Sequence, residues 1–161
     1  MSEFEKSINT LLEHEGGYVD HPTDPGGETK FGISKRSYPN VDIKNLTREG
    51  AIEIYRRDWW EKNKYEQITS QAVATKVFDA AINMGANQAH KLLQQAANAC
   101  GAAITVDGAL GAASIDAINK ISSNWLLDRF RVELVVFYAS LVRGDKKRIV
   151  FLLGWVTRAI S

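Results

Sequence analysis

Three carboxylates lie close together near the start of the sequence: Glu15, Asp20 and Asp24. Gly16-Gly17 follows Glu15 directly, and the residues after it form an acidic segment rich in turn-forming residues. A carboxylic acid at the buried side of a helix end, facing a polar loop, is an arrangement by which proteins build a general acid. This segment is therefore the first candidate for chemistry.

Helical spacing selects Glu15 among the acids. Apolar residues recur at the three-and-four spacing of one helix face at Phe4, Ile8, Leu11 and Leu12. Glu15 continues that face, whereas Glu13 falls on the polar side, and Gly16-Gly17 ends the predicted helix. Partial burial would raise the pKa of the Glu15 carboxyl and keep its proton available near neutral pH. The alternative is an ordinary last-turn residue whose side chain reaches water.

The loop after Glu15 supplies possible partners. Asp20 and Asp24 follow Glu15 by five and nine positions, and Thr29 comes five positions after Asp24. Residues 29–33 have the pattern of one strand of a small hairpin. Glycoside hydrolysis needs an acid on the leaving oxygen and, on the other sugar face, a carboxylate or a positioned water. Ordinary turn chemistry is the alternative for both aspartates, because Asp often bonds its own backbone in loops.

The irregular motif Glu15-Gly-Gly-Tyr, Asp24-Pro-Gly-Gly, Thr29 and Phe31-Gly-Ile resembles the signature of glycoside hydrolase family 108. This family comprises lysozyme-like N-acetylmuramidases found among phage endolysins and bacterial secretion-associated muramidases. The resemblance implies cleavage of the β-1,4 bond between N-acetylmuramic acid and N-acetylglucosamine in peptidoglycan. It also implies that Glu15 is the catalytic acid.

The second catalytic residue is less well defined than Glu15. The spacing from Glu15 to Asp24 also resembles that of phage-T4-type lysozymes, which favours an inverting reaction with Asp24 as the second carboxylate and Thr29 orienting water. The sequence departs from the family pattern at Asp20-His21, where Asn-Asp is usual, and at Ser34, where Thr is usual. Asp20 therefore stays an alternative to Asp24.

The middle of the chain offers groups that bind sugars. Thr47 is a predicted cap of a helix that ends near Asn63 and carries Trp59 and Trp60. Ser70 is a predicted cap of the next helix, whose stretch from Phe78 to Gly85 resembles a second family motif and places Asp79 and Asn83 one turn apart. Core packing is an alternative for the Trp pair, and bracing of the active-site loop for Asp79 and Asn83. The residues expected to bind substrate are Tyr18, His21, Phe31, Trp59, Trp60, Asp79 and Asn83.

The C-terminal part resembles a small helical peptidoglycan-binding module over about residues 97–161. The turn that carries this resemblance is Val106-Asp-Gly-Ala-Leu-Gly111, with Ser114 as the expected cap of the helix that follows. Such turn chemistry is also generic. The most apolar stretches, 132–142 and 149–156, are too short to span a bilayer and are predicted to be buried core helices. We therefore expect a catalytic region over 1–96 and a binding-like segment over 97–161, packed on the same core.

Composition is that of a compact enzyme and does not require a nucleic acid or a membrane as partner. The chain has 161 residues, of which 45% are hydrophobic and 24% charged, and its net charge is +1. This balance favours neither a nucleic acid nor a membrane as partner. Arg143 and residues 146–148 form a basic cluster that either attracts the anionic wall or is a solvated helix face. The lone Cys100 allows no internal disulfide and is expected to be buried.

The expected reaction is proton transfer with electrostatic stabilisation, so it needs no metal or organic cofactor. The N-terminus shows no secretory signal. We therefore expect synthesis in the cytoplasm and access to the wall through a holin or a dedicated export route. A monomer is the default for an enzyme that acts on a polymer.

The prediction is a mainly α, lysozyme-like α+β fold: a helical bundle with a small β-hairpin after the catalytic loop, and a cleft between its N-terminal and helical lobes. Its function would be peptidoglycan hydrolysis. Two alternatives remain, a non-catalytic wall-binding protein and a lytic transglycosylase.

Overall fold

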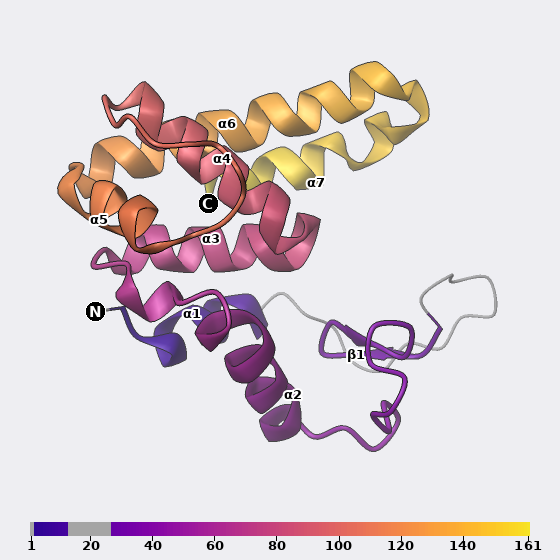
Figure 1. Ribbon diagram of the computed structural model, residues 1–161. Helices are drawn as coiled ribbons and strands as arrows, with labels where there is room; N and C mark the ends of the chain where they lie inside the picture. The colour runs from indigo at the N-terminus through magenta and orange to yellow at the C-terminus, as the bar shows by residue number, and fades with distance from the viewer. Residues whose placement is uncertain (1, 13–26) are drawn as a thin grey trace. The chain divides into compact units, whose positions relative to one another are not determined.

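The structure, a computed structural model, describes residues 2–12 and 27–161. Within these residues the fold is mainly α-helical, with one two-stranded antiparallel sheet (Figure 1). The chain forms two compact units, one over Glu3–Lys62 and the other over Asn63–Ser161 together with Ser2. The observed class is the one predicted, mainly α and lysozyme-like with a small hairpin.

The first helix has the buried face that the sequence predicts. Helix α1 spans Phe4–Leu12, and its buried residues are Phe4, Ser7, Ile8 and Leu11. Leu12 is only half-buried. The three-and-four spacing of this stripe therefore marks the inner side of α1 as far as Leu11.

The hairpin is tighter than expected. Strand β1 spans Thr29–Lys30 and β2 spans Ile33–Ser34, with Thr29 paired to Ser34 and Lys30 to Ile33. The prediction that 29–33 form a single strand is wrong, because Phe31 and Gly32 are the turn. Their φ angles are 52° and 75°. Two successive positive φ values are typical of the two-residue I′ turn, whose twist matches that of the strands.

The helix that carries the tryptophans changes its geometry half-way. The Thr47 side chain accepts a hydrogen bond of 3.1 Å from the Gly50 amide, as its predicted capping role requires. Helix α2 spans Arg48–Tyr55 and continues as the π-helix η1 over Arg56–Glu61. Regular α-helix thus ends well before Asn63. Short π-helical stretches occur frequently at functional sites.

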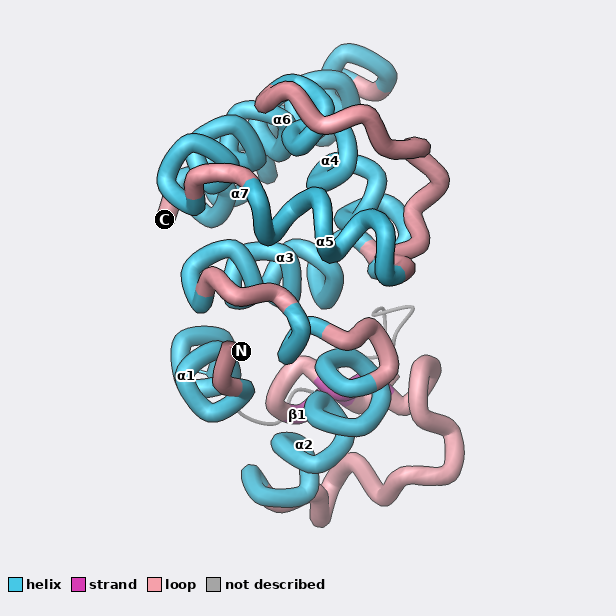
Figure 2. Tube along the Cα trace, turned by 60° about the vertical axis from the view of Figure 1, so that its left-hand side comes forward, coloured by secondary structure: helices cyan, strands magenta, loops and turns pink. Residues whose placement is uncertain are grey.

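The second unit is a helical bundle (Figure 2). It contains the 3₁₀ turns η2 (Tyr65–Gln67) and η3 (Lys146–Arg148) and the helices α3 (Gln71–Met84), α4 (Ala86–Ala99), α5 (Ala112–Lys120), α6 (Ser123–Gly144) and α7 (Ile149–Ile160). Helix α4 packs against α3 and α6, and α6 packs against α7. Ser70 caps α3 by accepting from the Val73 amide, as predicted.

The Asp-Gly turn is held by α4 rather than by the helix after it. Gln94 donates to the Asp107 carboxylate at 2.9 Å and accepts from the Gly108 amide at 2.8 Å. Gly108 has a φ of 80°, and a Cβ there would lie 2.3 Å from the Asn87 side chain, so only glycine fits. The predicted capping role of Ser114 is wrong, because α5 begins at Ala112 with Gly111 as its N-cap.

The prediction that the apolar stretches 132–142 and 149–156 are buried core helices holds only in part, because Leu134 and Tyr138 of the first are buried and no residue of the second is. Val136 is 57% exposed and Phe151 is also 57% exposed, and Ala159 is the only buried residue of α7 among those described. The core of this unit lies instead among α3, α4 and the inner side of α6, where Phe78, Leu93 and Phe130 are fully buried. Cys100 is half-buried rather than buried.

The division of the chain at residues 96 and 97 stays a prediction. The boundary falls inside helix α4 (Ala86–Ala99), and α4 packs against α6 within the second unit.

Candidate active site

The residues with the strongest predicted roles, Glu15, Asp20 and Asp24, lie outside the described residues, as do Tyr18 and His21. The structure does describe the segments that follow them in the same unit. These are the hairpin, which holds Thr29 and Phe31, and η1, which holds Trp59 and Trp60.

Thr29 is the first residue of β1 and is half-buried. Its hydroxyl donates a hydrogen bond of 3.3 Å to the Gly27 carbonyl. A hydroxyl that donates one hydrogen bond keeps its oxygen lone pairs as acceptors. The local geometry therefore leaves Thr29 able to accept a hydrogen bond from a water, which is its predicted role.

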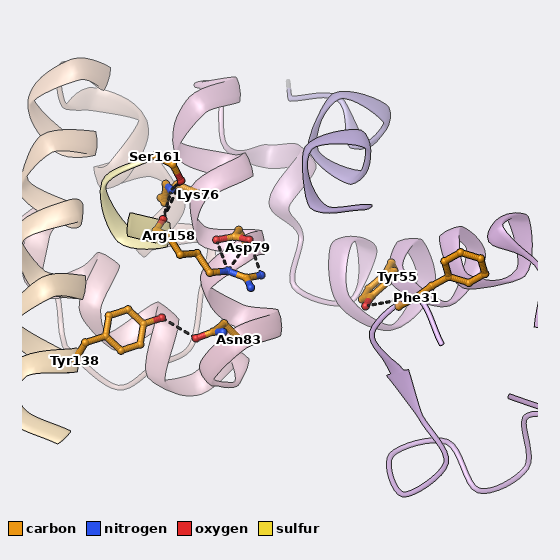
Figure 3. A network of polar contacts seen from close by, with 8 residues as sticks. All are labelled: Phe31, Tyr55, Lys76, Asp79, Asn83, Tyr138, Arg158 and Ser161. Carbon is orange, nitrogen blue, oxygen red and sulfur yellow. Dashed lines mark hydrogen bonds and ion pairs between the residues drawn. The ribbon is translucent and has the colours of Figure 1, made fainter. Parts of the chain in front are cut away.

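Phe31 is held in the turn by a helix. The buried Tyr55, at the end of α2, donates a hydrogen bond of 3.0 Å from its hydroxyl to the Phe31 carbonyl (Figure 3). Lys30 Nζ lies 5.7 Å from the centre of the Phe31 ring, and the ring is half-exposed. The hairpin thus presents an aromatic ring, whose face suits the apolar face of a sugar, on an anchored backbone.

The two tryptophans have different surroundings. Trp60 is 3% exposed and meets the Phe4 ring edge-to-face, with centroids 5.7 Å apart. Trp59 is half-exposed, and its indole N–H donates to the Tyr38 hydroxyl at 3.2 Å. Trp60 therefore belongs to the core, and the prediction of substrate contact is kept for Trp59.

Sequence reasoning missed a polar cluster beside Trp59. Arg57 donates two hydrogen bonds to the Asp58 carboxylate, at 2.6 and 2.8 Å, and the Tyr38 hydroxyl lies beside this carboxylate. The hydrogen bonds from Arg57 lower the pKa of Asp58, whereas burial raises the pKa of Tyr38. An ionised carboxylate next to a half-exposed indole can accept sugar hydroxyls. The signal in the sequence was the acid immediately before the Trp pair.

Two other groups near the Trp pair in sequence have structural roles. Arg56 donates to Glu5 at 2.8 Å, and its guanidinium lies 4.4 Å from the centre of the Phe4 ring. Tyr65, in the other unit, is fully buried and its hydroxyl bonds His90 Nε2 at 2.7 Å. These contacts hold α1 to η1 and η2 to α4, respectively.

Asp79 and Asn83 face the C-terminal helices of their own unit. Arg158 of α7 contacts Asp79 with Nη2 at 2.8 Å and Nε at 3.1 Å, and the Tyr138 hydroxyl of α6 donates to Asn83 Oδ1 at 2.7 Å (Figure 3). Burial raises the pKa of Tyr138 to about 12, so this hydroxyl keeps its proton. The pair braces α3 against α6 and α7, and its contact with substrate stays a prediction.

Within residues 2–12 and 27–161, no group of three or more His, Cys, Asp or Glu side chains is placed to hold a metal ion.

Comparison with known proteins identifies the segment that contains these residues. Residues 8–85 match the family model described as glycosyl hydrolase 108. This segment belongs to glycosyl hydrolase family 108. All the predicted site residues of this family 108 hydrolase, from Glu15 to Asn83, lie inside the matched segment, as do Tyr38 and Asp58.

The rest of this family 108 chain matches a second model. Residues 88–160 match a domain described as a predicted peptidoglycan domain. Together the two matches identify a glycoside hydrolase whose substrate is peptidoglycan.

A solved structure is similar over nearly the whole chain. SagA from Brucella abortus shares 28% sequence identity, with a TM-score of 0.78, over 97% of this chain and 88% of that one. Among proteins with curated descriptions, none matches the sequence. The likeness covers residues of both matched segments.

Proposed function

We propose that the chain is an N-acetylmuramidase that cleaves the β-1,4 bond between N-acetylmuramic acid and N-acetylglucosamine, with Glu15 as general acid. The main support is the family 108 match over residues 8–85, which includes Glu15. The buried face of α1 adds to it. Ile8 and Leu11 are buried, and the sequence carries their spacing four positions further to Glu15.

In this reaction the Glu15 carboxyl gives its proton to the glycosidic oxygen as the bond to the anomeric carbon breaks. Asp24, or alternatively Asp20, stabilises the positive charge that develops on the sugar or takes a proton from the attacking water. Thr29 orients that water. A general acid needs a carboxyl that stays protonated near neutral pH, and a second carboxylate on the opposite sugar face suits an inverting displacement.

The described residues supply two places where the glycan could be held. Phe31 offers a half-exposed ring on the anchored hairpin turn. Trp59 offers a half-exposed indole next to the ionised Asp58 carboxylate. Aromatic faces and carboxylate acceptors are the groups that bind the two chemically different sides of a sugar ring.

The reaction is tested by analysing the products made from purified, insoluble peptidoglycan. We expect wild type to release fragments with reducing muramic acid ends, which borohydride converts to muramitol with a defined gain in mass. Anhydro-muramyl ends would show a lytic transglycosylase instead. Release of no fragment, with the protein bound to the wall, would show a binding protein.

The second role is tested with matched amide substitutions. We expect Asp24→Asn to slow turnover much more than Asp20→Asn, and Thr29→Val to slow it more than Thr29→Ser, because serine keeps the hydroxyl. If neither aspartate substitution changes turnover on soluble glycan fragments, the two-carboxylate mechanism is wrong.

The biological setting that fits this activity is either lysis of a host cell or localised opening of the wall for export of another protein. We propose synthesis in the cytoplasm and passage to the wall through a holin or a dedicated export route, with the enzyme acting as a monomer. A holin gene next to this one would support lysis, and a toxin or secretion gene would support export.

A further inference from the structure

The outer face of α7 is apolar although it is exposed. Ile149, Val150 and Leu153 are 61%, 75% and 79% exposed. At 100° per residue they share one side of the helix with Thr157 and Ile160, which are also exposed. We call these five residues the α7 outer face. An exposed helix surface normally carries charged residues, so an exposed apolar face of this kind indicates a binding partner.

The opposite side of α7 already has its packing partners. The Trp155 ring stacks on Tyr138 of α6 at a centroid distance of 5.2 Å, and Ala159 is buried. Lys76 of α3 donates to the Arg158 carbonyl at 3.0 Å. Because these contacts fix which side of α7 faces the bundle, the α7 outer face is directed away from it.

The turn that leads into α7 is strongly basic. Arg143, Lys146, Lys147 and Arg148 are all exposed, and we call them the basic turn. Its one acidic neighbour is Asp145, which lies 3.5 Å from Arg148. Residues 146–161 contain no Asp or Glu. The basic turn and the α7 outer face are therefore contiguous in the chain, and Asp145 is the single acidic residue between Arg143 and Ile160.

These cations do not serve the stability of α7. The N-terminal end of a helix carries a partial positive charge, so Lys146, Lys147 and Arg148 are unfavourable for α7, although they also follow the C-terminal end of α6, where cations are favourable. The arrangement favours an external anion next to an apolar surface.

We propose that the basic turn and the α7 outer face together dock on the surface of an anionic phospholipid bilayer. The cations would lie among the phosphate headgroups while α7 lies in the plane of the interface, with Val150 and Leu153 directed toward the acyl chains. Twelve residues of helix extend about 18 Å, which is short of the roughly 30 Å hydrocarbon core. No helix within the described part of the chain is long and apolar enough to cross a bilayer.

Two other occupants fit less well. A second copy of the chain would bring the same face, in which Asp145 is the one acid beside four exposed cations, so the cations would meet with too few counter-charges. An anionic wall polymer would pair with the basic turn but would leave Val150 and Leu153 in water. An anionic bilayer supplies both the negative charge and the apolar phase. This docking does not depend on the proposed hydrolysis, since vesicle binding needs no glycan.

The test is co-sedimentation of the full chain with two kinds of vesicle, phosphatidylcholine alone and phosphatidylcholine mixed with phosphatidylglycerol. We expect binding only to the mixed vesicles, weakening as salt is raised. Lys146→Gln with Lys147→Gln should weaken it about 25-fold, at about fivefold per cation. Val150→Ser with Leu153→Ser should weaken it at least about tenfold. Lys44→Gln with Lys62→Gln, a matched pair of exposed lysines elsewhere, should leave it unchanged.

Four outcomes would overturn the proposal. The first is no binding to mixed vesicles, and the second is binding that survives Val150→Ser with Leu153→Ser, which would show charge adsorption alone. The third is binding that falls equally with the control lysines. The fourth is a dimer in sedimentation velocity that Leu153→Ser dissociates. All the substituted side chains are exposed, so we expect each variant to fold. Circular dichroism of each variant checks this.

Discussion

The Tyr55 hydroxyl donates a hydrogen bond of 3.0 Å to the Phe31 carbonyl and so joins the end of α2 to the turn of the hairpin. Phe31 holds a φ of 52°, a conformation that a bulky residue rarely adopts. Backbone strain of this kind persists where the surrounding structure holds it, and it is concentrated at functional sites. The relationship indicates that the position of the hairpin matters to this peptidoglycan hydrolase.

Removing the Tyr55 hydroxyl should loosen the hairpin. We expect Tyr55→Phe to lower the free energy of unfolding by about 1 kcal/mol, the usual worth of one hydrogen bond, and to reduce hydrolysis of soluble glycan fragments at a temperature where the protein stays folded. Urea unfolding and initial rates measure the two effects. Tyr65→Phe, a matched hydroxyl deletion in the other unit, should lower stability at unchanged hydrolysis. Equal hydrolysis rates for Tyr55→Phe and Tyr65→Phe would show that the position of the hairpin does not affect activity.

Phe31 should show a conflict between stability and activity. Asn-Gly is a preferred pair for a I′ turn, so Phe31→Asn should relieve part of the roughly 1–2 kcal/mol that a left-handed backbone imposes on most residues. The melting temperature should rise or hold while KM increases, because the half-exposed ring is lost. Thermal unfolding and steady-state kinetics test both. If the variant is more stable and keeps full activity, the Phe31 ring does not contact the substrate.

Asp79 and Arg158 should stabilise the second unit as a pair. Both side chains are about three-quarters shielded from solvent, and three short contacts join them. A double-mutant cycle with Asp79→Asn and Arg158→Gln should therefore give a coupling free energy of about 1 kcal/mol in urea unfolding. If Asp79 only braces α3, KM stays at the wild-type value. A raised KM with little coupling would assign Asp79 to substrate binding instead.

His90 should make stability depend on pH. Burial lowers its pKa below 6.5 in the folded protein, where Nδ1 and Nε2 bond the Gly108 carbonyl and the Tyr65 hydroxyl. The unfolded chain therefore binds the proton more readily, so this contribution to stability is intact above about pH 6.5 and declines as pH falls below it. Urea midpoints between pH 8 and 5, in wild type and in His90→Gln, measure the effect. A midpoint that declines as steeply in the variant would assign the pH dependence to other groups.

Local signals in the sequence were sufficient for much of the fold. Thr47 and Ser70 cap the helices they were predicted to cap, because a side-chain oxygen can satisfy a free amide at a helix start without help from the rest of the fold. The hairpin was expected at the right place. The positive φ of Phe31 was not expected, because no sequence pattern predicts a phenylalanine in the left-handed conformation.

The errors came where tertiary contacts decide. Ser114 is a good cap by residue type, but Gln94 reaches the preceding turn from α4 and the helix begins earlier. The apolar composition of α7 suggested burial, and composition alone does not say which helices have partners on both sides. Asp58 was missed because only the folded chain brings it to Tyr38, which lies 20 positions earlier in the sequence.

The central claim is that Glu15 is the general acid of a muramidase, and Glu13 provides its internal control, because the two acids differ in helical phase. The measurement is the rate of appearance of reducing muramic acid ends from purified peptidoglycan, for wild type, Glu15→Gln and Glu13→Gln, each verified as folded. We predict that Glu15→Gln slows the rate by about 10²- to 10⁴-fold, the range for loss of a general acid, and that Glu13→Gln stays near wild type. Comparable rates for Glu15→Gln and wild type, or an equal loss in both variants, would contradict the account.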